Sequence, residues 1–301
     1  MFLPFGGSYS GMQVYDMKTV LVTGNQGFLG RAVCRTFSQN GYCVVNEGDT
    51  LDVTKFGDLC AEYAFRDVDY IIHLAGRSEV SYGEANPRDA FEVNVAGTWN
   101  IMELAIQLRV SAVIIASTER LGIGKVEPQS IYETSKSCSE SVAKAYFRSF
   151  GIPVAICRFG IIFGEGDSSH TRLIPSLCRA LINDEYFVVK SPSNAHRKFI
   201  FVDDAVNALI FLIEESERHQ LTYGHTVEVA YAEAYSISYV VRALVEASGK
   251  NHLLPKMTPR KKSTPTSGTV KNLSHFGWSP KFAMRDALFR TFRSYDQNDE
   301  V

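Results

Sequence analysis

The chain lacks a strong net charge, a long apolar run and any paired cysteine motif. It has 31 Lys and Arg against 33 Asp and Glu, a formal net charge of −2, so no global basic field is present to hold nucleic acid. No apolar run reaches the ~18 residues of a membrane span. Its six cysteines occur singly, without the spacing of metal sites, and are expected to be free thiols in a reducing cytosol. We therefore expect a cytoplasmic protein that binds no metal, nucleic acid or membrane.

The N-terminal segment, residues 1–16, lacks the features of a secretory signal. It carries glycine and serine, but neither the basic region nor the apolar region of a secretory signal. We expect it to be an N-terminal extension upstream of a start at Met12 or Met17. The remaining length suffices to bury a sizeable core.

From Lys18 onward, short apolar β-rich runs alternate with longer segments of helical period. This alternation indicates a parallel sheet with helices on both faces. Right-handed crossovers then give a Rossmann-like, doubly wound α/β domain over residues 17–160. The expected strands are Thr19 to Thr23, Tyr42 to Val45, Tyr70 to Leu74, Val113 to Ser117 and Val154 to Arg158. The expected helices are Phe28 to Gln39, Lys55 to Tyr63, Pro87 to Gln107 and Ile131 to Phe150.

After about Gly160 the alternation loosens. Residues 161–301 are expected to form mainly a smaller C-terminal α/β lobe. Phe199 to Val202 and Thr226 to Val229 still have strand character, so we expect residues 197–230 to return to the first domain.

Three glycines at three-residue spacing follow the first expected strand: Gly24, Gly27 and Gly30. Without Cβ atoms, the first two permit a tight turn and close approach of backbone N–H groups to a pyrophosphate, and the third permits close helix packing. The position between a strand and an amphipathic helix favours a dinucleotide site over a plain turn.

The spacing Gly-x-x-Gly-x-x-Gly resembles the short-chain dehydrogenase/reductase superfamily, and His73 to Gly76 and Asn94 to Thr98 extend the likeness over most of the chain. The chain resembles the extended type, the NAD-dependent epimerase/dehydratase family. The resemblance implies NAD as cofactor, a nucleoside-diphosphate sugar as substrate, a substrate-binding C-terminal lobe and a homodimer. It assigns cofactor contacts to Gly24, Gln26, Gly27, Phe28, Leu29, Asp52, Val53, Leu74, Ala75, Gly76, Asn94, Tyr132 and Lys136.

Acidic residues follow the second expected strand. Glu47 and Asp49 can accept a hydrogen bond from a ribose 2′-hydroxyl and would repel a 2′-phosphate, which favours NAD over NADP. Asn46 stands close to the place of the family's acidic residue. Asp52 resembles the family aspartate near the adenine, and a turn acid or helix cap before Thr54 is the alternative.

Tyr132 and Lys136 are four residues apart, which places them on one helical face. A nearby ammonium group favours phenolate, so Tyr132 can exchange a proton with a substrate hydroxyl while hydride moves to or from nicotinamide. The pair opens the helix that follows the strand ending at Ala116 to Glu119, as in the superfamily.

Aligned without gaps, Ala116 to Gly122 resembles the Ser-Thr-Ser-Glu-Leu-Tyr-Gly segment of GDP-mannose 4,6-dehydratases. The match implies that Ser117 is the hydroxyl beside Tyr132, that Thr118 takes the place of an Asp or Ser, and that Glu119 is the general base. A solvated loop acid is the alternative for Glu119. A dehydratase is therefore implied, with a 4-epimerase, a keto-sugar reductase or a non-catalytic dinucleotide-binding regulatory protein as alternatives.

The segment Arg158 to Gly164 resembles the family's Arg-x-x-Asn-x-Tyr-Gly strand end, but Ile161 stands where Asn usually contacts the sugar nucleotide. The resemblance implies that Arg197 clamps the substrate diphosphate, a task suited to a planar bidentate donor. Arg172 is a second candidate clamp, with a surface salt bridge as the alternative. The stretches 171–175 and 196–204 look most like CDP-glucose 4,6-dehydratases.

Overall fold

The computed structural model describes residues 17–45, 52–63, 66–122, 128–218, 223–258 and 270–296. The expected extension at 1–16 and the acidic segment at 46–49 lie outside these residues.

Six parallel strands form the central sheet, in the order β2-β1-β3-β4-β5-β9. Their side chains are mostly buried and apolar, as expected for strands covered on both faces. From β1 the chain passes to β2 on one side and then to β3 on the other, so a crevice opens at the carboxyl ends of β1 and β3. The strands are β1 (Thr19–Thr23), β2 (Cys43–Val45), β3 (Tyr70–His73), β4 (Ala112–Thr118), β5 (Val154–Phe159) and β9 (Thr226–Val229).

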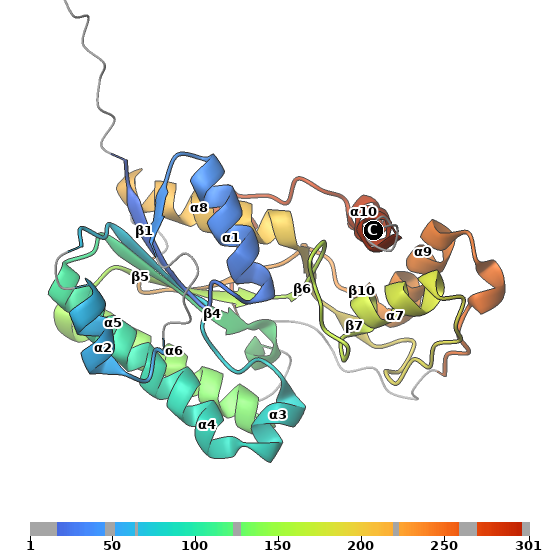
Figure 1. The fold of residues 1–301 in the computed structure, drawn as a ribbon, viewed down its shortest axis with the longest axis horizontal. Coiled ribbons are helices and arrows are strands. Elements are labelled where there is room, and N and C mark those ends of the chain that lie inside the picture. The colour runs from blue at the N-terminus through green and yellow to red at the C-terminus, as the bar shows by residue number, and fades with distance from the viewer. Residues whose placement is uncertain are drawn as a thin grey trace, which may run out of the picture.

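Helices cover both faces of the sheet (Figure 1). One face carries α1 (Phe28–Gln39) and α8 (Val202–Arg218), and the other carries α2 (Phe56–Tyr63), α5 (Gly97–Leu108) and α6 (Ile131–Phe150). Each pair of layers encloses its own cluster of buried apolar side chains. This arrangement confirms the Rossmann-like fold class that the sequence predicts.

The helix expected over Pro87 to Gln107 is present, but it contains an unexpected π turn. The structure has α4 (Pro87–Phe91), a π-helical turn η1 (Glu92–Ala96) and α5, preceded by α3 (Val80–Ala85). The turn contains Asn94, whose carbonyl accepts hydrogen bonds from the hydroxyls of Thr98 and Ser139. Hydroxyl groups that bond to helix carbonyls loosen the regular ladder, and π turns of this kind often occur at functional sites.

A second lobe follows β5 and lies to the right in Figure 1. Its helices pack against one another, and its apolar core is continuous with that of the α1 and α8 layer. Two short two-stranded sheets join it to the first domain, one parallel (β6 with β8) and one antiparallel (β7 with β10). The elements are β6 (Ile161–Phe163), α7 (Leu173–Ile182), β7 (His196–Arg197), β8 (Phe199–Phe201), β10 (Tyr235–Ser236), α9 (Ile237–Ser248), η3 (Asn251–Leu253), η4 (Leu273–Phe276) and α10 (Met284–Asp296).

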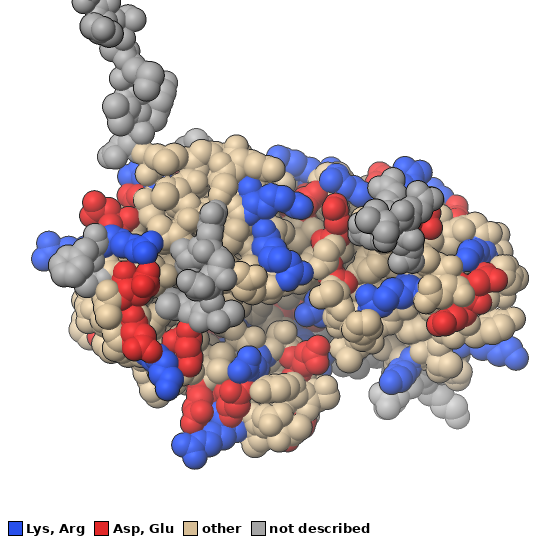
Figure 2. All heavy atoms as spheres, in the orientation of Figure 1, with Lys and Arg blue, Asp and Glu red and all other residues tan. Residues whose placement is uncertain are grey.

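The surface shows charges of both signs side by side, without a broad basic field, on the face drawn in Figure 2. Within the part of the chain that the structure describes, no helix is long and apolar enough to span a bilayer. No group of three or more acidic, His or Cys residues in the same ranges could hold a metal ion.

Asp204, in the first turn of α8, anchors the segment that leads into α10. Its buried carboxylate accepts backbone N–H groups of Lys281 and Phe282, at 2.7 and 3.4 Å. The neighbouring Asp203 is more exposed and pairs with Arg290 at 3.4 Å.

We predict that Asp204→Ala lowers the free energy of unfolding by about 1–3 kcal/mol, because two backbone donors lose their acceptor. The matched variant Asp203→Ala is expected to cost less than about 1 kcal/mol, since exposed ion pairs contribute little. Urea unfolding curves measure both changes. Equal losses for the two variants would contradict the anchoring role of Asp204.

Candidate active site

A cavity of about 580 Å³ opens at the carboxyl ends of the parallel strands. Its walls come from the glycine turn after β1, the end of β4, the start of α6 and the second lobe. Figure 2 shows the molecular face hollowed between the two lobes. The cavity is therefore located where a doubly wound sheet binds its ligands.

The turn between β1 and α1 is shaped by the absence of side chains. Gly24 has a φ of +70°, and a Cβ built on it would lie 2.6 Å from the backbone nitrogen of Ala75. A Cβ on Gly30 would lie 2.1 Å from the Gly24 carbonyl oxygen. The backbone can thus bring the N-terminus of α1 close to a ligand, and that helix end suits a pyrophosphate. These residues fit the pyrophosphate of a dinucleotide.

The first turn of α6 is held by a capping box. The Ser130 hydroxyl accepts the N–H of Glu133 at 3.1 Å, and the Glu133 carboxylate accepts the N–H of Gln129 at 2.7 Å. Arg120 also donates to Glu133, at 3.0 Å. This double anchorage orients the helix start, which carries Tyr132 and Lys136 into the cavity wall.

Lys136 is buried, and its ammonium group donates to the carbonyl of Ala116 at 2.9 Å. Burial lowers the pKa of Lys136 to about 8, and the charge of Glu140 opposes that fall. Burial raises the pKa of Tyr132, while its hydrogen bond with Thr118 and the charge of Arg120 oppose the rise. A phenol and an ammonium group in one buried wall can exchange protons with a bound hydroxyl.

The hydroxyl groups at the end of β4 point in different directions. The Thr118 side chain acts on Tyr132 and lowers the pKa of its phenol. Ser117, expected beside Tyr132, instead donates to Glu140 at 2.6 Å. Successive side chains of a strand alternate between the two faces of the sheet, so only one of these neighbours can face the phenol. Both hydroxyl-bearing residues line the cavity, so the predicted role of Ser117 at the reacting oxygen stays a prediction, with Thr118 as the other candidate.

Glu119 follows β4 in the short helix η2 (Glu119–Gly122) and is only 5% exposed. One of its carboxylate oxygens, Oε2, has no hydrogen-bond partner among the described residues. Burial raises the pKa of Glu119 to about 7, although the charges of Arg197 and Arg120 oppose the rise. A buried carboxyl group in a cavity wall with a pKa near neutrality is suited to acid–base work.

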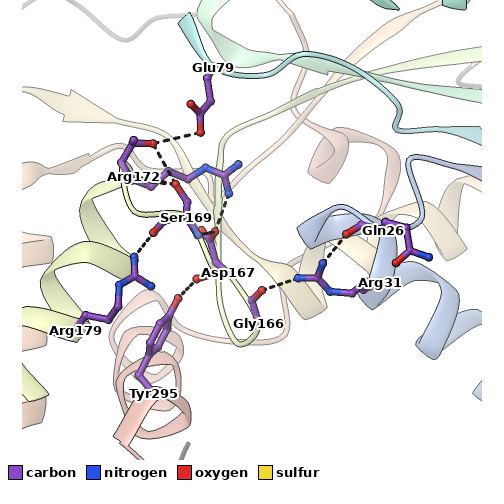
Figure 3. Close-up of polar contacts among 10 residues, drawn as sticks. Gln26, Arg31, Glu79, Gly166, Asp167, Ser169, Arg172, Arg179 and Tyr295 are labelled. Atoms are coloured by element: carbon purple, nitrogen blue, oxygen red, sulfur yellow. Dashed lines mark hydrogen bonds and ion pairs between the residues drawn. The ribbon is translucent and has the colours of Figure 1, made fainter. Parts of the chain in front are cut away.

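Arg172 lines the cavity from the loop between β6 and α7, and Asp167 holds its guanidinium group at 3.0 Å (Figure 3). The loop itself is fastened at several points. Arg31 of α1 donates to the Gly166 carbonyl at 3.0 Å, and Tyr295 of α10 donates to the Asp167 carbonyl. Arg172 therefore presents a fixed cation to the cavity.

Arg197 and Ile161 complete the wall on the side of the second lobe. Arg197 donates to the neighbouring His196 carbonyl at 2.9 Å. Its positive charge opposes the rise in the pKa of Glu119. Ile161 is 37% exposed and offers the cavity no polar group. Two arginines, at positions 172 and 197, thus line the cavity, and the Arg172 guanidinium group is paired with Asp167.

Comparisons with known proteins show the family of the chain. Residues 20–229 match the model of the NAD dependent epimerase/dehydratase family, which is more than half of the chain. The chain belongs to this family. Because the family is NAD dependent, the predicted NAD cofactor is confirmed, and so is the prediction of an enzyme of the epimerase/dehydratase family.

Similar family members differ in the reactions for which they are named. A UDP-glucuronic acid decarboxylase 6 from Arabidopsis thaliana is 24% identical over 89% of this chain and 86% of its own. A UDP-glucose 4-epimerase from Thermotoga maritima has a TM-score of 0.80 at 19% identity, covering 93% and 99% of the two chains. A dTDP-glucose 4,6-dehydratase from Streptomyces venezuelae has a TM-score of 0.78 at 21% identity, covering 94% and 98%. At these identities the solved structures establish the fold.

Most residues predicted for this family's site line the cavity. They are Gly24, Gly27, Phe28, Leu29, Leu74, Gly76, Ser117, Thr118, Glu119, Tyr132, Lys136, Arg172 and Arg197. The other predicted residues do not line it. The Asp52 carboxylate accepts the N–H and hydroxyl of Thr54 at 3.0 and 2.7 Å, so it closes a turn. The Gln26 carbonyl accepts from Arg31, Val53 is buried, and the Ala75 N–H donates to the Thr23 hydroxyl.

Asn94 acts as a support for this family's site. Both ends of its side-chain amide bond to the backbone of Arg77, at 2.7 and 3.1 Å, and its amide nitrogen also donates to Ser135 at 2.8 Å. It therefore ties the segment after β3 to α6, one residue before Lys136. Its predicted contact with the cofactor stays a prediction.

Sequence reasoning missed four charged residues around the site: Arg120, Glu140, Arg158 and Asp167. Glu140 follows Lys136 by one helical turn, and this spacing is the signal that could have found it. Arg158 was recognised only as part of a strand-end motif. The partners of Arg120 and Asp167 depend on tertiary contacts that no local pattern encodes.

We predict that Thr118→Val lowers kcat by about a hundredfold, because it removes a hydrogen-bond donor from the reacting oxygen. Ser117→Ala is expected to lower kcat by less than about tenfold, the effect of one lost buried hydrogen bond. Steady-state kinetics on the substrate identified below compare the two variants. The reverse ranking would show that Ser117 is the reacting hydroxyl.

Proposed function

We propose that the protein is an NAD-dependent nucleotide-sugar dehydratase. The observation that carries this proposal is Glu119, a buried carboxyl group with a pKa of about 7 in the same cavity wall as Tyr132 and Lys136. Oxidation of a sugar alcohol needs one acid–base group, which the phenol beside the ammonium group supplies. A second acid–base group is needed when a carbon-bound proton must also be removed.

The substrate class follows from the two arginines that line the cavity. Arg172 and Arg197 can each bind phosphate oxygens through planar guanidinium groups. The glycine turn would hold the pyrophosphate of NAD, so the arginines are left for the diphosphate of a nucleoside-diphosphate sugar. Ile161 supplies an apolar contact where relatives carry an amide, and it therefore contributes to the choice of sugar.

The mechanism begins at the sugar C4 hydroxyl. Tyr132, as phenolate, accepts the hydroxyl proton, while Thr118 donates a hydrogen bond to the same oxygen and Lys136 stabilises the phenolate. Bound NAD would accept hydride from C4 and return it to C6. The 4-ketone acidifies the C5–H bond, and Glu119 removes that proton as a carboxylate. A group with a pKa near 7 can pass the proton to the departing C6 hydroxyl, so that water leaves. Once C6 has received hydride, C5 takes up a proton from solvent and Tyr132 releases the proton it accepted, which completes the net loss of one water.

A 4-epimerase or keto-sugar reductase would use Tyr132, Thr118 and Lys136 in the same way and leave Glu119 without a task. A non-catalytic dinucleotide-binding protein would need none of them. We also propose a homodimer through α5 and α6, where the large apolar side chains Trp99 and Phe150 are exposed.

Product mass is the test of the proposed reaction. With a panel of UDP-, dTDP-, CDP- and GDP-hexoses and NAD, we expect one product that is lighter by one water. An isomer of unchanged mass would establish an epimerase, and loss of carbon dioxide from a uronate would establish a decarboxylase. Wild-type activity that survives Tyr132→Phe would remove the proposed proton transfer.

Glu119→Gln is expected to abolish exchange of the C5 hydrogen with deuterium oxide while NAD still binds, because the amide cannot act as a base. In the wild type, exchange should rise as pH increases through about 7, since the carboxylate form is the base. Nuclear magnetic resonance of the substrate follows the exchange. Glu165→Gln, at an exposed acid just after β6, is the matched control and should exchange normally. Exchange at the wild-type rate in Glu119→Gln would exclude the dehydratase role.

A further inference from the structure

A buried ionic cluster lies beneath the cavity wall and has no part in the mechanism above. Its centre is Glu140 of α6, which is 3% exposed. Arg158 of β5 donates to both carboxylate oxygens, at 2.7 and 2.8 Å, and the Ser117 hydroxyl donates at 2.6 Å. Lys144, one turn further along α6, approaches at 3.5 Å.

Glu140 keeps its negative charge in this place. Burial by itself would raise the pKa of Glu140, but the hydrogen bonds and charge of Arg158 and the Ser117 hydroxyl outweigh burial and lower it. A buried carboxylate with this many donors is a fixed anion at any pH at which the enzyme works. Its charge is therefore available to act on neighbours.

The end of β4 connects Glu140 to the reacting groups. Successive residues there act on different partners: the Ala116 carbonyl accepts from Lys136, the Ser117 hydroxyl donates to Glu140, and the Thr118 side chain lowers the pKa of Tyr132. A shift of Ser117 would therefore displace the contacts on both sides of it. Glu140 thus anchors the strand end that serves both Tyr132 and Lys136.

Other charged groups near Lys136 are engaged elsewhere or neutral. His73 of β3 is buried, and burial together with the charge of Lys136 lowers its pKa to about 3, so it is uncharged. Glu119 and Arg120 of η2 lie on the side of Tyr132. The charged residues of α3, α4, η1 and α5 bond to other partners: Glu84 to the Ile131 N–H, Asp89 to Arg77, Arg88 to Glu92, and Glu103 to Tyr146.

We propose that Glu140 is a positioning residue, which fixes the end of β4 through Ser117 and keeps Lys136 charged, and that Arg158 limits this effect by sharing the carboxylate. The proposal rests on the proposed catalytic role of Lys136. It predicts that loss of Glu140 lowers the pKa of Lys136 and that loss of Arg158 raises it. General damage to the fold would not produce shifts of opposite sign.

The test is the pH dependence of kcat. Glu140→Gln removes the anion and leaves Arg158, so Lys136 should lose its proton at lower pH. The alkaline limb of the profile is then expected to move down by on the order of one pH unit. Arg158→Gln leaves the anion less compensated, so the alkaline limb should move up. The double variant should return the limb towards the wild-type position.

Lys144→Gln is the matched control, because its longer and more exposed contact with Glu140 predicts a smaller upward shift than Arg158→Gln. NAD binding and the thermal unfolding midpoint of every variant show which ones are folded. If Arg158→Gln does not fold, Glu140→Gln and Lys144→Gln still test the proposal, because the alkaline limb is expected to move down in the first variant and up in the second.

Acetylation of Lys136 across a pH series, read by mass spectrometry on the cofactor-free protein, gives its titration without turnover. Titration at lower pH in Glu140→Gln, and at higher pH in Lys144→Gln and Arg158→Gln, would support the proposal whether or not a substrate is found. Identical titration in wild type and Glu140→Gln, or shifts of the same sign in all variants, would overturn it. Absence of turnover in the wild type would instead count against the proposed function.

Discussion

The hydrogen bond from the Lys136 ammonium group to the Ala116 carbonyl joins the two elements that make the site. It holds the start of α6 against the carboxyl-terminal part of β4. A Cβ on Gly76 would lie 3.2 Å from the lysine nitrogen, so the glycine after β3 leaves room for this contact. The glycine turn after β1, Lys136 and the hydroxyl groups at the end of β4 therefore lie at the same edge of the sheet.

Burial is the main influence on the ionisable groups at that edge. It lowers the pKa of Lys136 and raises that of Glu119, so these two groups move towards neutrality from opposite sides. Burial also raises the pKa of Tyr132, which keeps the free phenol protonated. Fixed charges moderate these shifts: Glu140 acts on Lys136, and Arg120 and Arg197 act on Glu119. A closed wall with a few placed ions can thus provide both a base and an acid near neutral pH.

The second lobe contributes cations and shape to the site. Its loop between β6 and α7 is tied to α1 by Arg31 and to α10 by Tyr295 (Figure 3). Arg172 is consequently held by parts of the molecule that are remote in sequence. Proteins named for epimerisation, dehydration and decarboxylation are all similar to this chain. The residues at positions 119, 161, 172 and 197 line the cavity beside the Tyr132–Lys136 pair.

The sequence by itself determined the doubly wound sheet, the glycine turn and the Tyr132–Lys136 pair, because periodicity, glycine spacing and helical spacing are local properties of the chain. Only the tertiary structure decided which hydroxyl faces the phenol. The strand register turns Ser117 towards Glu140 and Thr118 towards Tyr132, and an ungapped motif match carries no information on side-chain direction. The π turn at Asn94 and the partners of Glu140 and Asp167 were likewise set by packing between distant segments.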